Sequence, residues 1–208
     1  MPNDSWQLVH AERASLADDL ETLTAEQWAA ASLCADWNVH QMLGHMVATA
    51  KTNPLNFFGR FAQAGFRFHH FNARGVARET GAGPAATLAE FRAHLNDTSA
   101  PPGPADVVIG EVIIHSADIR RPLGISYTPP VDAVRKVADF YQGSNAIVGA
   151  KNRIAGLTLV ATDSDWRHGT GPELHGPLLS LVQAMTGRGV AMADLSGDGV
   201  EVLRGRMG

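Results

Sequence analysis

Glu111-Val-Ile-Ile-His115 places a carboxylate and an imidazole four residues apart in an apolar stretch whose pattern predicts a buried helix. Four residues on an α-helix turn through about 400°, so the two side chains lie roughly 40° apart on one face. One divalent cation could contact both. His45, in an earlier amphipathic segment, would supply a third ligand from a second helix. Three protein ligands leave a fourth position for water or substrate, which is typical of catalytic rather than structural zinc.

The composition favours a globular protein and excludes several classes of partner. With 45% hydrophobic and 18% charged residues among 208, the chain can bury a core in one domain or two small ones. Its net charge of -4 and scattered arginines offer no basic field for nucleic acid. No stretch approaches the roughly 18 apolar residues of a membrane span, and the first residues lack the pattern of a signal peptide. We therefore expect a cytoplasmic protein.

Cysteine content restricts the ligands that a metal could have. The chain has one cysteine, Cys34, and nine histidines. A single cysteine excludes an internal disulfide and a cysteine-rich zinc cluster. A metal would therefore be held by histidine and carboxylate, which accept zinc, nickel or iron.

The first 120 or so residues carry helical spacing in segments separated by Pro or Gly. An amphipathic pattern predicts a first helix from about Ser5 to Leu23. Thr24 and Gln27 fit a capping box at the start of a short helix. Asn38 is expected to cap the next long helix, whose apolar stripe turns His45 toward the core.

Two further helices are expected before the Glu111/His115 helix. The segment from Pro54 to Phe71 is rich in phenylalanine and predicts one helix that forms a wall of the pocket, with the phenylalanines mainly in the core. The next helix runs from about Ala85 to Asn96. The Glu111/His115 helix should end near Pro122, because a proline there stops it.

The pattern changes after about Pro129. Val131–Tyr141 predicts a helix, and the alternating, β-branched segment Gly156–Asp163 predicts a strand. Helical spacing returns over Pro172–Met185. The last elements are predicted as two short strands, Val190–Leu195 and Val200–Leu203, joined by a turn. The tail is thus expected to be a small α+β unit.

Four motifs together resemble one known family. They are Asp36–Asn38, Leu43–His45, Gly110–Gly124 and Ala161–Gly176, of which Gly110–Gly124 is the most specific. The family is that of the mycothiol-dependent maleylpyruvate isomerases, and the resemblance covers nearly the whole chain. It implies an α+β fold with a DinB-like four-helix bundle over residues 1–150 and a small α+β domain over residues 151–208.

The resemblance also implies a site and a cosubstrate. The family's metal, usually zinc, would be held here by His45, Glu111 and His115. A functional arginine that follows a glycine near the C-terminal end corresponds to Arg188 after Gly187, so Arg188 is the expected catalytic residue. The thiol would be mycothiol, which replaces glutathione in actinobacteria, and this implies an actinobacterial source.

Two thiol reactions follow from such a site. A divalent metal held by two neutral imidazoles and one carboxylate can lower the pKa of a bound thiol. Thiolate addition to an electron-poor double bond permits rotation and elimination, which gives an isomerase; displacement of a leaving group gives a thiol S-transferase. Both use the same residues, and Arg188 would hold a carboxylate of the substrate or part of mycothiol.

Two other functions stay open. A non-catalytic module that encloses a small ligand, with a sterol-carrier-like tail, would need no metal. A metal-dependent hydrolase would use metal-bound water, although the chain lacks the adjacent base of an HExxH motif. The expected partners are a small-molecule substrate and a low-molecular-weight thiol, without nucleic acid or membrane; helix faces of the bundle also allow a homodimer.

Asp118 has two interpretations. It lies three residues after His115 and could accept a hydrogen bond from that imidazole. It could instead pair with Arg121, three residues further on, and the sequence favours this second interpretation.

Overall fold

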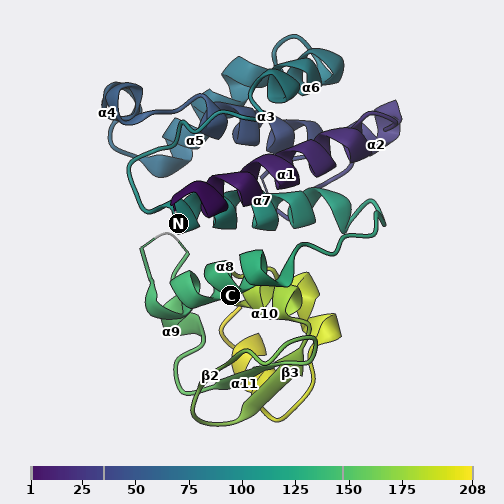
Figure 1. Ribbon diagram of the computed structural model, residues 1–208, viewed down its shortest axis with the longest axis vertical. Coiled ribbons are helices and arrows are strands. Elements are labelled where there is room, and N and C mark those ends of the chain that lie inside the picture. The colour runs from purple at the N-terminus through teal and green to yellow at the C-terminus, as the bar shows by residue number, and fades with distance from the viewer. Residues whose placement is uncertain (1, 35, 147, 208) are drawn as a thin grey trace. The chain divides into compact units, whose positions relative to one another are not determined.

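The computed structural model describes residues 2–34, 36–146 and 148–207, which divide into two units between Thr128 and Pro129 (Figure 1). The division lies earlier than the boundary after residue 150 that the sequence suggested. The reason is α8 (Val131–Gly143), which packs against α10 (Leu178–Met185) of the second unit.

The first unit is a helical bundle. α3 packs against α5, α6 and α7, while α1 packs against α6 and α7 (Figure 1). The expected helical bundle is therefore confirmed. Its helices are α1 (Pro2–Leu20), α2 (Ala25–Ala29), α3 (Val39–Ala50), α4 (Pro54–Gln63), α5 (Phe68–Thr80), α6 (Pro84–Ala93) and α7 (Ala105–Arg120). Among these described helices, none is long and apolar enough to cross a membrane.

Both predicted helix starts in this unit are confirmed as capping boxes. The Thr24 side chain accepts from the Gln27 amide, and the Gln27 side chain accepts from the Thr24 amide. Asn38 and Gln41 make the same reciprocal pair at the start of α3. Two free backbone amides are satisfied each time, which fixes where α3 begins and hence which side chains it turns inward.

A buried cation joins the first and last helices of this unit. Arg120 is 1% exposed. Its guanidinium donates to Glu12 at 2.7 Å, to Asp19 at 2.7 Å and to the Ser15 hydroxyl at 2.9 Å, all on α1. The Tyr127 ring lies against the same guanidinium, 4.3 Å from its centroid. These contacts fix the position of α7 along α1.

The phenylalanine-rich segment is two helices, so the prediction of one helix over Pro54–Phe71 was wrong. Gly65 and Phe66 adopt positive φ angles of 66° and 57°, and this left-handed turn ends α4 and redirects the chain into α5. No residue of α4, all of which the structure describes, is buried. The expectation that these phenylalanines lie mainly in the core was therefore also wrong for α4.

The second unit surrounds a small sheet, which confirms the α+β fold class. The strand order is β2-β1-β3, with β1 antiparallel to β2 and parallel to β3. α10 packs on β1 and on α8. The elements of the second unit after α8 are α9 (Ala150–Arg153), β1 (Thr158–Ala161), β2 (Arg167–Gly169), β3 (Glu173–Gly176), α10, the 3₁₀ helix η1 (Gly189–Asp194) and α11 (Gly199–Arg204).

The two strands predicted at the end of the chain are wrong. The first is η1, which buries Ala191 and Met192. The second is α11, which buries Gly199 and Leu203. The two buried residues of η1 are neighbours in the sequence, which the alternation of a strand with one buried face does not produce, and those of α11 are four residues apart, as on one face of a helix. The turn between them is present, with Gly197 at a φ of 104°.

Candidate metal centre

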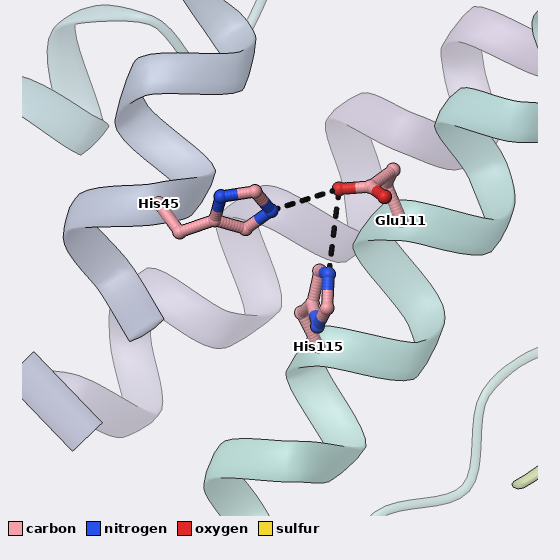
Figure 2. Close-up of side chains that lie close together, drawn as sticks. All are labelled: His45, Glu111 and His115. Atoms are coloured by element: carbon pink, nitrogen blue, oxygen red, sulfur yellow. Dashed lines mark hydrogen bonds and ion pairs between the residues drawn. The ribbon is translucent and has the colours of Figure 1, made fainter. Parts of the chain in front are cut away.

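The structure brings His45, Glu111 and His115 together in the bundle. Figure 2 shows the three side chains turned toward one another, His45 from α3 and the other two from α7. Nε2 of His45 lies 3.2 Å from Oε2 of Glu111, and Nε2 of His115 lies 3.4 Å from the same oxygen. All three donor atoms lie within 4.8 Å of one another. The i,i+4 spacing on α7 thus produces the shared face that it predicted.

Asp118 fixes the orientation of the His115 ring. Its Oδ2 lies 3.0 Å from Nδ1 of His115, and its side chain is fully buried. When the imidazole is neutral, this contact places the proton on Nδ1, which donates to the carboxylate, and leaves the lone pair on Nε2. The structure thus shows the contact between Asp118 and His115, the interpretation that the sequence favoured less.

His45 is held by aromatic contacts. The Trp37 ring stacks on its imidazole with centroids 4.9 Å apart and an interplanar angle of 29°. The loop that carries Trp37 is fixed in turn, because the Ser32 hydroxyl donates to the Trp37 carbonyl at 2.7 Å and the Leu33 amide donates to the Asp118 carbonyl at 3.0 Å. No role was predicted for Trp37, although its place directly before Asn38, the N-cap of α3, was a signal.

In the absence of a metal, the Glu111 carboxylate and the His115 imidazole form an ion pair. Burial alone would raise the pKa of Glu111, but the imidazoles of His115 and His45 hold it well below its usual range. Burial lowers the pKa of His115, whereas the carboxylates of Glu111 and Asp118 raise it, with a net increase to about 9. In the metal-free protein, a proton on His115 therefore provides the positive charge that the carboxylates favour.

The donor types fit a divalent cation, and so do the two separations between the Glu111 oxygen and the imidazole nitrogens. Two atoms bound to zinc at about 2.0–2.1 Å and separated by the tetrahedral angle lie roughly 3.3 Å apart. The two nitrogen–oxygen distances are 3.2 and 3.4 Å. The Glu111 side chain is 24% exposed while the two imidazoles are 9% and 11% exposed, so the site is enclosed yet reachable from solvent.

Arg188 lies in the second unit. It precedes η1 as its N-cap, and its Nη1 donates to the Thr186 carbonyl at 3.1 Å. Nη1 of Arg153 donates to the carbonyls of Val148 at 2.9 Å and of Met185 at 2.6 Å. Burial and the charge of Arg188 both lower the pKa of Arg153. A catalytic role for Arg188 remains a prediction.

Fold and site define a helical-bundle protein with a candidate His₂Glu metal centre and a small α+β unit. The chain belongs to the mycothiol maleylpyruvate isomerase family, since the model of that family's N-terminal domain matches residues 9–120, which include His45, Glu111 and His115. This is a little over half of the chain.

Two solved structures resemble nearly the whole chain. Both are crystal structures of a mycothiol-dependent maleylpyruvate isomerase, and one of them is a histidine-to-alanine mutant. The sequence identities are 16% for the mutant and 15% for the other, with a TM-score of 0.64 in each case. Each comparison covers 94% of this chain and 92% of the other. At these identities the likeness shows a shared fold. A comparison with curated proteins gave no match.

Proposed function

We propose that the protein is a metal-dependent enzyme that uses mycothiol as a thiol cosubstrate on a small electrophilic substrate. It acts either as an isomerase of the maleylpyruvate type or as a thiol S-transferase, in the cytoplasm of an actinobacterium. The convergence of the His45, Glu111 and His115 donor atoms on one point carries this proposal. Family membership supports the choice of mycothiol.

His45, Glu111 and His115 would hold the metal, for which zinc is proposed because the donor spacing fits its tetrahedral geometry. When bound, the metal supplies Lewis acidity that favours the thiolate form of a thiol. Glu111 offsets one of the ion's two charges, and Asp118 keeps Nε2 of His115 directed at the site.

The two reactions differ in the fate of the mycothiol sulfur. In isomerisation the thiolate forms a carbon–sulfur bond at an electron-poor double bond, the resulting single bond rotates, and elimination breaks the carbon–sulfur bond and releases the thiolate. In transfer the new carbon–sulfur bond persists, and the leaving group departs with its bonding electrons. In both, Arg188 is proposed to bind a carboxylate of the substrate or part of mycothiol.

The first experiment measures metal content by elemental analysis in protein prepared without a nickel column. The comparison is between the wild type, Glu111→Ala/His115→Ala and the control His94→Ala, whose imidazole pairs with Glu90 and Asp97 away from the site. We expect about one zinc per chain in the wild type and in the control, and none in the double variant. Wild-type protein that stays metal-free after zinc is added back would overturn the proposal.

A second experiment separates the two reactions. The metal-loaded protein is incubated with mycothiol and either maleylpyruvate or an electrophile that carries a leaving group. Recovery of free mycothiol with an isomerised product assigns the isomerase, and a stable thioether assigns the transferase. Turnover of the same substrates without any thiol would contradict the role of mycothiol, and a product of cleavage by water would indicate a hydrolase.

A further inference from the structure

Four large apolar side chains are exposed on α4, on α5 and on the turn between them. Their exposed fractions are 91% for Leu55, 64% for Phe58, 71% for Phe66 and 62% for Phe68. We call this set the α4–α5 face. Large exposed apolar patches on a soluble protein mark a contact with another molecule, whereas single exposed residues are common.

A layer of aromatic rings supports the α4–α5 face. Phe61 contacts Phe66 with ring centroids 5.7 Å apart and Phe68 with centroids 4.6 Å apart. Phe57 contacts Phe58 at 5.5 Å. Phe66 is the one non-glycine residue with a positive φ in the described part of the chain, and this conformation is unfavourable for a bulky side chain. Backbone strain of this kind concentrates where it serves a function.

The segment around the face carries positive charge in a chain that is negative overall. Between Asp36 and Glu79 the sequence has no carboxylate, whereas Arg60, Arg67 and Arg74 lie in α4, in the turn and in α5. The nearby carboxylates are engaged otherwise. Glu79 and Glu90 pair with Lys51, and Glu79 also pairs with Arg78. Asp36 lies 4.0 Å from His69.

Although the sequence predicted no membrane partner, we propose that the α4–α5 face attaches the protein reversibly to the surface of an anionic lipid bilayer. The four apolar side chains enter the boundary between headgroups and acyl chains, and the exposed Arg67 and Arg74 meet the lipid phosphates. α4 suits this role because it buries no residue within the protein. The attachment lies on the membrane without spanning it, and it is independent of the metal centre.

Charge and exposure argue against two other occupants of the face, a second copy of this chain and a different protein. A two-fold contact between copies of this chain would place the same face on itself and bring its arginines together, which is unfavourable. The anchors of a protein partner usually fill packed pockets. The four side chains here are at least 62% exposed, as insertion into a lipid interface requires.

The test is flotation of the full chain with vesicles of phosphatidylcholine alone or of an equal mixture with phosphatidylglycerol. We expect flotation with the mixed vesicles only, and weaker flotation at high salt because the phosphates are screened. Phe58→Ser/Phe68→Ser should lower the partition coefficient by at least about tenfold, since each phenylalanine contributes its burial to binding. Arg67→Glu should lower it by several-fold.

The matched control is Val190→Ser/Val202→Ser, which removes apolar side chains that are 44% and 39% exposed in the second unit. It should float like the wild type. Leu55→Ser, at a side chain that is 91% exposed, tests the same face if the phenylalanine variant folds poorly. Wild-type protein that stays unbound with mixed vesicles would overturn the proposal, as would equal flotation of both double variants. A wild-type dimer that Phe58→Ser/Phe68→Ser converts to monomers, without flotation, would assign the face to a second copy instead.

Discussion

Oδ2 of Asp118 lies 3.0 Å from Nδ1 of His115, which is one turn earlier on the same helix. The Asp118 side chain is fully buried. This contact determines which nitrogen of His115 faces Glu111 and His45. It makes Asp118 a positioning residue for the candidate metal centre.

Asp118→Asn should weaken zinc binding by about 10–100-fold while the fold is retained, because an amide no longer fixes the imidazole as a carboxylate does. Competition with a fluorescent zinc chelator measures this affinity. Asp97→Asn, at the half-exposed carboxylate that pairs with His94, is the control and should leave the affinity unchanged. Equal affinities of the wild type and Asp118→Asn would show that Asp118 does not position His115.

The stability of the metal-free protein should depend on pH through the ion pair of the site. The raised pKa of His115, about 9, gives a contribution that is fully present below 6.5 and is lost as the pH rises through 9. The lowered pKa of Glu111 gives a second contribution to stability, which is present above pH 4.5 and is lost on acidification. The pair therefore stabilises the metal-free protein most between these limits.

Glu111→Gln tests this dependence with little change in shape. In thermal unfolding of metal-free protein, the wild type should lose stability between pH 6.5 and 9, and the variant should lose much less. Zinc affinity of the wild type should rise over the same range, because the ion displaces the proton from His115. Parallel curves for the wild type and Glu111→Gln would contradict the pairing.

Arg120→Ala should destabilise the first unit by about 3–5 kcal/mol, because it leaves the buried Glu12 carboxylate without its partner. Urea unfolding measures the loss. Arg204→Ala removes an exposed arginine that pairs with Glu201 and should change the free energy of unfolding by less than about 1 kcal/mol. Similar effects of the two substitutions would show that the buried network does not hold α7.

Gly197→Ala should destabilise the second unit. The φ of 104° is unfavourable for alanine, and a Cβ there would lie 2.4 Å from the Glu173 carbonyl oxygen. The control Gly143→Ala, at the end of α8 with nothing within 4 Å, should be neutral or stabilising. Thermal unfolding followed by circular dichroism distinguishes the two, and an unchanged melting temperature for Gly197→Ala would exclude a strained turn.

Local rules predicted the parts of the fold that depend on a few neighbouring residues. The capping box at Thr24, the N-cap at Asn38 and the shared face of Glu111 and His115 follow from residue types at short spacing along a helix. The break at Gly65 and Phe66 was missed because nothing local requires a phenylalanine to adopt a left-handed conformation. Valine spacing suggested a strand at Val200–Leu203, where packing of Leu203 selects a helix.

The candidate site was predictable to a similar extent. Ligand types and spacing identified Glu111 and His115, and the inward stripe of α3 with the family resemblance added His45. The stacking of Trp37 on His45 was not predicted, and the contact of Asp118 with His115 was only one of two interpretations, because both depend on tertiary positions.

The contacts of Arg120 also bear on the order in which the protein assembles. Its partners Asp19 and Glu12 precede it by 101 and 108 residues. Contacts between such distant residues form late, because a long loop must close before they stabilise the chain. During synthesis these contacts cannot form until Arg120 has left the ribosome, so the position of α7 along α1, and with it that of the candidate ligands Glu111 and His115, is fixed only after nearly all of the first unit has been made.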